Sequence, residues 1–222
     1  MKTADDLDAL AARALLPDHE ERVGGWLARA TPSSALRRVN SARPVGAPLD
    51  VDALSAWYAA RGAEPLVMLA PEEAFTALDE ELAGRGWAFE AASEVLVGDP
   101  DTVLDQLAGR PHAVVPGELG PDEGVGRSLD PVVPLVAAGG AGRATVVLQE
   151  RWSLLRGLEV DESARRQGIA AALVRAWARL AEGRSLYLQM YADNEPARAL
   201  YTAAGFTRSH GYHYRRAPAG RG

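Results

Sequence analysis

One stretch of the sequence, residues 158–181, limits most strongly what this chain can fold into. A mostly apolar run of strand length, 153–160, leads into it and has the composition of a strand buried inside a sheet. After a turn around Gly168, apolar residues recur at three- and four-residue spacing, and Gly183 is well placed to end the helix that this spacing predicts. The residues on its apolar face are Ile169, Leu173, Trp177 and Leu180. The sequence therefore predicts a buried strand, a glycine turn and a long amphipathic helix in succession.

The turn between this strand and helix has the composition of an anion site. At a helix N-terminus, unpaired backbone N–H groups and the positive end of the helix dipole point the same way. Gly168 lets a ligand approach the backbone closely, and Ala170 adds little bulk. Arg165 and Arg166 supply charge-assisted donors. We therefore predict that this turn holds a pyrophosphate; a plain helix start is the alternative.

Composition restricts the classes of protein to which the chain can belong. Its 222 residues allow one large domain or two small ones, with a hydrophobic content of 47% that is ordinary for a soluble protein. A net charge of -6 argues against general nucleic-acid binding, and the lack of cysteine excludes disulfides and thiolate chemistry. Four scattered histidines without His-Glu-x-x-His spacing predict no metal site. With neither a signal peptide nor a membrane-spanning apolar run, we expect a soluble cytoplasmic protein.

The first hundred residues predict an α/β half that lacks a glycine-rich anion turn. Helices are expected over 7–15 and 52–61 and from Pro71 onward, and strands over 22–30, 36–42, 66–69, 87–90 and 94–97, the last two paired. The turn at 98–101 suggests a boundary, which gives a half over 1–99, a domain over 100–217 and a tail over 218–222. A structural or substrate-gripping role for the first half is preferred to a second catalytic site.

The second half predicts a hairpin, the central strand–turn–helix, a further strand and a short helix. Strands are expected at 113–115, 132–137, 144–149 and 185–191, with a closing hairpin of 206–209 and 212–215. The strand over 144–149 and the strand ending at Val160 should be antiparallel neighbours. Asn194 is a strong N-cap candidate for the short helix, and Gly205 is expected just beyond its end.

Two segments together resemble the GNAT superfamily of acyl-coenzyme A N-acyltransferases. Residues 165–170, Arg-Arg-Gln-Gly-Ile-Ala, resemble the family's Arg/Gln-x-x-Gly-x-Gly/Ala pyrophosphate turn. Residues 192–201, Ala-Asp-Asn-Glu-Pro-Ala-Arg-Ala-Leu-Tyr, followed by Gly205-Phe206, closely match its acetyl-CoA-side helix. The match covers about 144–215. It implies an α/β (α+β) fold with a mixed, mostly antiparallel sheet and helices on both faces.

The N-terminal half is similar to the first half of tandem GNAT-like proteins, including the string Arg37-Arg38-Val39-Asn40-Ser41. The resemblance implies a smaller, degenerate GNAT-like half without a cofactor motif. A GNAT domain usually places one or two helices between its first two strands, where they help form the acceptor pocket. Here the interval from Val115 to Val132 is short and rich in glycine, proline and acid. This departure leaves room for the N-terminal half to contribute to the acceptor site.

The resemblance implies acetyl-CoA as co-substrate and a set of residues that contact it. The predicted cofactor-binding residues are Leu158, Val160, Arg165, Arg166, Gln167, Gly168, Ile169, Ala170, Asn194 and Ala197. In the family, the strand edge matching 158–160 pairs with pantetheine, and one of its N–H groups stabilises the developing oxyanion. That edge is free only if the strand splays from the one ending at Tyr191. For Asn194, helix capping alone is an equally good interpretation, whereas Arg198 is predicted to be solvated or near the phosphates.

Two further residues are predicted to act in catalysis, an amine's attack on a thioester. Tyr201 resembles the family's general acid, a phenol that protonates the departing sulfur; core packing is the alternative. Glu159 is the candidate general base, on the opposite face of its strand from Leu158 and Val160, with Glu150 as a second candidate. Both carboxylates are more typical of ordinary strand edges. His210 and His213 could assist but belong to the final hairpin, where packing roles are commoner.

The sequence thus predicts an acetyl-CoA-dependent N-acetyltransferase that works by direct transfer in a ternary complex. The acceptor is expected to be a small-molecule or peptide primary amine, and the acidic net charge favours a cationic or neutral one. No nucleic-acid or membrane partner is expected, and a homodimer is possible. A non-catalytic acyl-CoA sensor is the main alternative. A nucleotide-binding domain of another kind is disfavoured, because both the P-loop and the three Rossmann glycines are missing.

Overall fold

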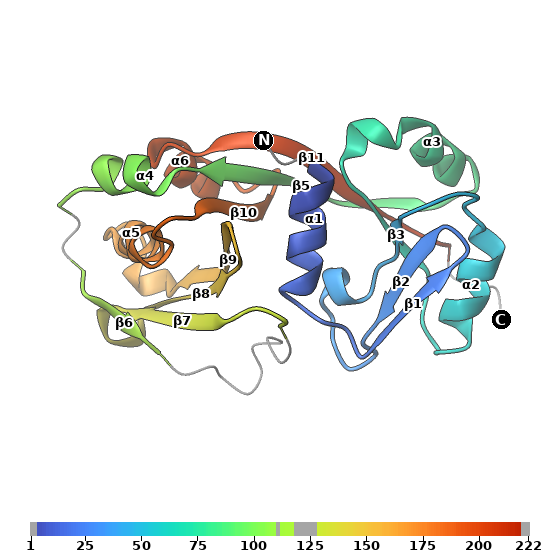
Figure 1. Cartoon of the computed structure of the whole chain (residues 1–222), viewed down its shortest axis with the longest axis horizontal. Coiled ribbons are helices and arrows are strands. Elements are labelled where there is room, and N and C mark those ends of the chain that lie inside the picture. The colour runs from blue at the N-terminus through green and yellow to red at the C-terminus, as the bar shows by residue number, and fades with distance from the viewer. Residues whose placement is uncertain (1–3, 110–111, 118–127, 219–222) are drawn as a thin grey trace. The chain divides into compact units, whose positions relative to one another are not determined.

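The computed structural model describes residues 4–109, 112–117 and 128–218 (Figure 1). The chain forms two compact units, one of residues 1–93 with 210–222 and one of residues 94–209. Two long strands, β5 (Ala88–Gly98) and β11 (Thr207–Arg216), each have residues in both units. The boundary expected after residue 99 falls at the end of β5, whereas the two units divide within β5 and within β11.

The first unit combines a three-stranded antiparallel sheet with three helices. Its elements are α1 (Ala4–Arg13), β1 (His19–Val23), β2 (Trp26–Ala30), β3 (Arg43–Pro44), α2 (Val51–Ala59), β4 (Leu66–Leu69) and α3 (Thr76–Gly84). The small sheet has the order β1-β2-β3. Its core contains Trp26, Leu54, Tyr58, Val67, Leu69 and Leu82, all buried. The expected helix over 52–61 and strand over 66–69 are confirmed.

Two strand predictions in this unit are wrong for local reasons. The expected strand over 22–30 is a β1–β2 hairpin, because Gly24 has a φ of 57° and reverses the chain. The expected strand over 36–42 instead begins as a 3₁₀ turn, Arg37–Val39. The side chain of Asn40 explains that turn: its Oδ1 accepts from the Thr31 N–H, and its Nδ2 donates to the carbonyls of Ser34 and Leu36. These hydrogen bonds hold residues 31–40 in a loop, and an extended strand over 36–42 would break them.

The larger sheet has eight strands in the order β4-β11-β5-β10-β9-β8-β7-β6. The remaining elements are α4 (Pro100–Gln106), β6 (Val114–Pro116), β7 (Val132–Ala137), β8 (Gly142–Leu148), β9 (Trp152–Val160), α5 (Ile169–Leu180), β10 (Ser185–Tyr191) and α6 (Glu195–Ala203). From β6 to β9 each strand is antiparallel to the next, whereas β9 and β10 are parallel. This mixed, mostly antiparallel sheet with flanking helices confirms the predicted fold class.

Two predicted pairs of short strands are each a single long strand. Residues 87–97 were expected to hold a strand pair, but β5 runs without a break and absorbs only a local irregularity at Ala91, where φ is 52°. The expected closing hairpin over 206–215 is the one strand β11. Gly211 lies between the two expected strands, yet it is buried within β11, as are the residues on either side of it.

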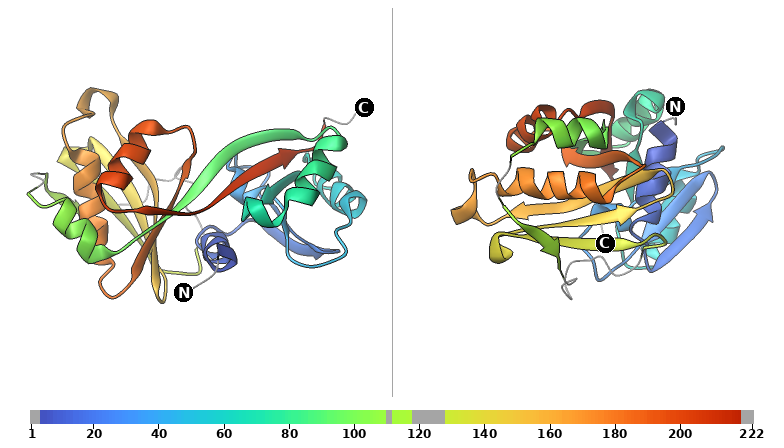
Figure 2. Two further views of the ribbon diagram at one scale, coloured as in Figure 1. Left: turned by 90° about the horizontal axis from the view of Figure 1, so that it is seen from above. Right: turned by 60° about the vertical axis from the view of Figure 1, so that its left-hand side comes forward.

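Helix α5 packs against β7, β8 and β9 (Figure 2). It does so through the apolar face that the sequence predicted. Ile169, Leu173 and Trp177 are buried, while Leu180 at the helix end is partly exposed. A Cβ at Gly142 would lie 2.4 Å from the Ile169 Cγ2, so only a glycine lets the first turn of α5 approach β8 this closely. None of the helices in the described part of the chain has the length and hydropathy needed to cross a membrane.

Candidate functional site

Strands β9 and β10 part in the middle of the sheet. Their paired residues run from Trp152↔Ser185 to Leu155↔Leu188, and pairing ends there although both strands continue and lie wholly within the described residues. Just beyond, Gly157 has a φ of 60° and the register between β8 and β9 shifts, which indicates a bulge. The β10-facing edge of residues 158–160 is therefore unpaired. The predicted pantetheine site required this splay.

The turn between β9 and α5 presents backbone amides. Arg166 has a φ of 63° and Gly168 a φ of 86°, both in the left-handed region. Such residues turn neighbouring N–H groups toward one side, and the resulting concave arrangement binds anions. Gly168 is also the N-cap residue of α5, and no side chain caps that helix start. The first amides of α5, which have no partner within the helix, thus remain available to a ligand.

The side chains of the turn lie at the surface. Arg165, Arg166 and Gln167 are all exposed. The Arg165 Nε lies 3.4 Å from the Val160 carbonyl oxygen, and the Gln167 Nε2 lies 3.4 Å from that of Ser163. Ile169 is buried and anchors the helix start in the core. The structure therefore places the predicted phosphate-binding residues together on one exposed turn.

His112 is a residue of this site to which the sequence analysis gave no role. Its Nε2 lies 2.6 Å from the carbonyl oxygen of Gln167. A carbonyl only accepts, so the imidazole donates this hydrogen bond. Its Cδ2 lies 3.9 Å from the place where a Cβ on Gly168 would stand. A lone histidine 55 residues before the turn carries no spacing signal, and only the folded chain shows the contact.

The start of α6 confirms the capping role of Asn194. Its Oδ1 accepts from the Ala197 N–H at 3.1 Å, which occupies that amide. Ala197 packs beside the hydrophobic core. Arg198 donates to Glu94 Oε2 at 2.6 Å and so belongs to an ion pair with β5. Contact of Asn194 and Ala197 with a cofactor stays a prediction.

Tyr201 lies on the buried face of α6. It is 6% exposed, and its ring packs edge-on against Phe206 at 5.6 Å between centroids. Burial raises the pKa of the phenol to about 12, so it keeps its proton at neutral pH. Its hydroxyl has no hydrogen-bond partner among the described residues. Packing and an available proton are thus both present, and the acid role stays a prediction.

The surroundings of the candidate general bases do not indicate a catalytic role. Glu159 is exposed, and its Oε2 accepts from Arg143 Nη2 at 2.6 Å, whereas Leu158 and Val160 pack toward the core as alternation predicted. Glu150 is also exposed. His210 is buried beside Asp8, with 3.1 Å between its Nε2 and a carboxylate oxygen. His213 Nε2 lies 2.7 Å from an oxygen of Asp79. Both histidines contribute to packing and to polar contacts with a carboxylate, and the base role of Glu159 stays a prediction.

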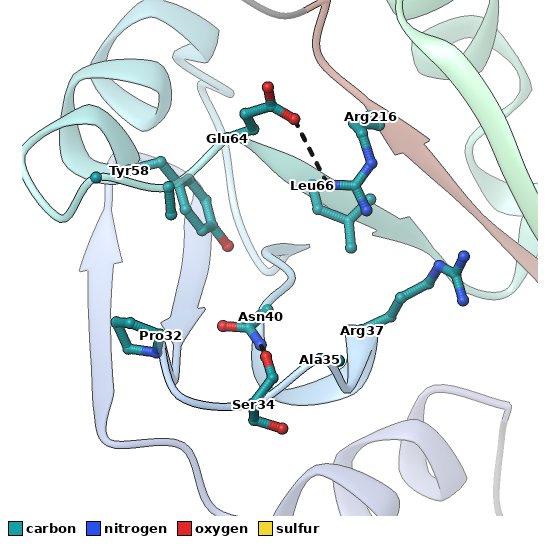
Figure 3. A pocket seen from close by; sticks show the side chains of 11 residues that line it. Pro32, Ser34, Ala35, Arg37, Asn40, Tyr58, Glu64, Leu66 and Arg216 are labelled. Carbon is teal, nitrogen blue, oxygen red and sulfur yellow. Dashed lines mark hydrogen bonds and ion pairs between the residues drawn. The ribbon is translucent and has the colours of Figure 1, made fainter.

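A pocket of about 300 Å³ lies in the first unit (Figure 3). Its lining residues include Arg37, Asn40, Tyr58, Glu64, Leu66 and Arg216, and none of the predicted cofactor-binding or catalytic residues. Both arginines bind the Glu90 carboxylate, and the hydrogen bond from Arg216 is the main cause of a lowered Glu90 pKa. The 37–41 string therefore helps to build this unit through Asn40 and Arg37.

The comparisons with known proteins agree with this geometry. Residues 132–206 match the profile of the Acetyltransferase (GNAT) family. A GCN5-related N-acetyltransferase from Kribbella flavida is 17% identical, with 99% of this chain and 97% of that one covered and a TM-score of 0.72. A tandem GNAT protein from the clavulanic acid biosynthesis pathway is 16% identical, with coverages of 100% and 90% and a TM-score of 0.57. A conserved protein of unknown function from Staphylococcus epidermidis is 14% identical, with coverages of 89% and 92% and a TM-score of 0.68. No curated protein matches the chain.

Proposed function

We propose that this chain, which has the GNAT fold and carries an acetyltransferase-family domain at residues 132–206, moves an acetyl group from acetyl-CoA to a primary amine. The transfer is direct, within a ternary complex of protein, acetyl-CoA and amine. One observation carries the proposal: the uncapped amide turn at Gly168 directly follows a strand, β9, whose edge is free where β10 splays away. An anion site and an extended-chain site therefore adjoin, as a coenzyme with a diphosphate and an amide-containing arm requires.

The cofactor would lie along this continuous surface. Amides of residues 165–170 would bind its diphosphate, with the exposed Arg165 and Arg166 side chains adding charge-assisted hydrogen bonds. The pantetheine arm would pair with the free edge of residues 158–160 as an added strand does. Asn194 and Ala197, at the start of α6, are proposed to contact the arm from the other side of the splay. This arrangement delivers the thioester to the point where β9 and β10 part.

The chemical step uses the same surroundings. The amine nitrogen attacks the thioester carbonyl carbon, and a backbone N–H of β9 stabilises the oxyanion that forms. Collapse breaks the C–S bond, and the departing thiolate takes its proton from Tyr201, which burial keeps protonated. The nitrogen of the new amide loses its extra proton, which restores the phenol through solvent. The incoming ammonium must first lose a proton. Glu159 is the proposed base, and it acts in this way only when its carboxylate is released from Arg143.

Calorimetry with acetyl-CoA and with CoA, followed by a thiol-release screen over primary amines, tests this function. We expect both ligands to bind and at least one amine to release the thiol. The second candidate, an acyl-CoA sensor, is favoured by the Glu159–Arg143 ion pair, which occupies the proposed base. Binding of acetyl-CoA with no thiol release across the amine panel would select the sensor. Absence of binding would reject both functions.

A further inference from the structure

The face of β9 and β10 that is turned away from α5 carries polar side chains. Leu155, Leu188 and Met190 belong to the hydrophobic core that α5 covers. Side chains alternate along a strand, so Arg156 and Gln189 lie on the other face. A ring contact supports this assignment. Trp152 lies on the same face of β9 as Arg156, and Tyr187 lies on the same face of β10 as Gln189, because an even number of residues separates each pair. The two rings meet edge-on with 5.9 Å between their centroids.

Arg156 and Gln189 flank the point where the strands part. Leu155↔Leu188 is the last pair of the β9–β10 register, and these two residues come next on their strands. Tyr201 and the buried apolar side chains of α5, β9 and β10 belong to one hydrophobic core on the other side of the sheet. An acceptor that reaches a thioester held in the splay therefore approaches from the side of Arg156 and Gln189.

Gln189 has an unsatisfied polar atom. Its Nε2 is buried and has no hydrogen-bond partner among the described residues. Buried polar atoms are nearly always satisfied, so such an atom needs an explanation. The neighbouring Tyr187 hydroxyl donates to Gln149 Oε1 at 2.8 Å and forms no hydrogen bond with the Gln189 amide. A ligand that accepts a hydrogen bond would satisfy the amide.

We propose that Gln189 and Arg156 bind the carboxylate of the acceptor, which is then an amino acid or another small primary amine that carries a carboxylate. The inference rests on the proposed function. An amide N–H₂ and a guanidinium are both donors, and a carboxylate accepts from each. A zwitterionic amino acid is neutral overall, so the chain's net charge of -6 does not repel it. Its deprotonated amine attacks the thioester, the C–S bond breaks, and an N-acyl amino acid and the free thiol of CoA result.

Matched pairs of acceptors test this inference. Each pair is an amino acid and the amine that lacks only its carboxylate, assayed by thiol release with acetyl-CoA at saturation. We expect kcat/KM to be at least about tenfold higher for the amino acid, because hydrogen bonds to a charged group contribute about 1.5 kcal/mol or more each. In Gln189→Leu and Arg156→Gln, this ratio should fall toward one while the dissociation constant for CoA stays within about twofold.

Controls separate this inference from the function on which it rests. Arg179→Gln removes a charge from the end of α5 and should leave the ratio unchanged. If wild-type protein binds CoA but shows a ratio near one, or if both variants keep the high ratio, the carboxylate site is wrong and the acetyltransferase proposal survives. Release of thiol by no amino acid also overturns it. Failure to bind CoA overturns both.

Discussion

The helix starts of α2 and α5 belong to different units and differ in a way that bears on function. Asp50 caps α2, where its Oδ1 accepts from the Ala53 N–H at 2.8 Å. At α5 the equivalent position is Gly168, which has no side chain to do this. Two further helices in the described part of the chain resemble α2: Asp99 caps α4 and Asn194 caps α6. The amides of a helix start can bind an anion only where no side chain caps them. The start of α5 is uncapped, and it also has a left-handed turn and two exposed arginines beside it.

The arginines of the α5 turn differ in the same sense from Arg215 and Arg216 of the first unit. In the first unit, Arg215 donates two hydrogen bonds to Asp79, at 2.6 and 2.9 Å, and Arg216 binds Glu90. At the α5 turn, Arg165 and Arg166 are exposed, and neither forms an ion pair with a described residue. Arg215 and Arg216 thus bind carboxylates of the protein itself, as Arg143 and Arg198 do in the second unit, whereas Arg165 and Arg166 are left for a ligand.

The largest effect is expected from Gly168→Asp, which gives α5 the capping carboxylate of α2. Aspartate tolerates the left-handed conformation better than most residues, so the fold should survive. Its carboxylate would occupy the first-turn amides and repel phosphate. We expect CoA binding to weaken by at least about 100-fold, equivalent to about two charge-assisted hydrogen bonds. Calorimetry measures this, with the isosteric but uncharged Gly168→Asn as control; a Gly168→Asp loss under tenfold would contradict the comparison.

Tyr201→Phe should lower kcat by about 100-fold or more, because general acid catalysis contributes at least that much. Affinity for acetyl-CoA should stay within about twofold. Since the pKa of Tyr201 is raised to about 12, wild-type kcat should show no alkaline loss from this group below about pH 11. Thiol-release kinetics measure both, and Tyr191→Phe, at an exposed position, is the matched control. An unchanged kcat with chemistry rate-limiting would remove Tyr201 from the mechanism.

Asp79→Asn tests whether the ion pairs of the first unit are structural. The hydrogen bond from Arg215 is the main cause of a lowered Asp79 pKa, to about 2. The wild-type ion pair therefore stabilises the fold above the unfolded aspartate pKa of about 4, and this contribution disappears as the pH falls toward 2. Urea unfolding should show a less stable variant at pH 7 and a flatter pH dependence between 4 and 2. Equal stability at both pH values in variant and wild type would refute this role.

Asp50→Ala should cost about 1 kcal/mol of unfolding free energy, the usual value of a lost N-cap. Asp50→Asn retains a capping oxygen and should restore most of it. Neither variant should change affinity for CoA, because the predicted site lies at the other helix. Urea denaturation measures the unfolding free energy, and calorimetry measures the affinity for CoA. Tighter CoA binding by Asp50→Ala would mean that any uncapped helix start of this chain is enough to bind the diphosphate.

The smallest effect is expected from His112→Ala. Loss of one hydrogen bond to the Gln167 carbonyl loosens the turn by roughly 0.7 kcal/mol, which weakens CoA binding about threefold. His112→Gln can still donate and should recover part of the loss. Tenfold tighter binding in His112→Ala would show instead that the imidazole blocks the site.

The sequence predicted the structural features that depend on local periodicity. It did not predict those that depend on tertiary contacts. The apolar face of α5, the antiparallel β8–β9 pair and the Asn194 cap follow from spacing within about ten residues. The unbroken strands β5 and β11 do not, because burial along their length outweighs the turn residues that they contain. His112 reaches the turn from a distant segment, and the position of Arg156 and Gln189 beside the splay depends on where the β9–β10 register ends.

Part of the predicted acceptor region lies outside the described residues. Part of the interval expected between Val115 and Val132 falls at 118–127, outside the described residues. The contribution of the N-terminal half to the acceptor site, the cytoplasmic location and the homodimer stay predictions. The carboxylate site proposed at Gln189 lies entirely within the second unit and is open to test without them.

The most direct measurement follows backbone amides by NMR while CoA is added to the full chain. If the turn at Gly168 holds the diphosphate, the amide signals of residues 165–170 should shift in proportion to bound CoA, and those of residues 51–53 at the capped start of α2 should not. Adenosine without phosphates should leave both sets in place. Unmoved signals at 165–170 under saturating CoA, or equal shifts at both helix starts, would contradict the account.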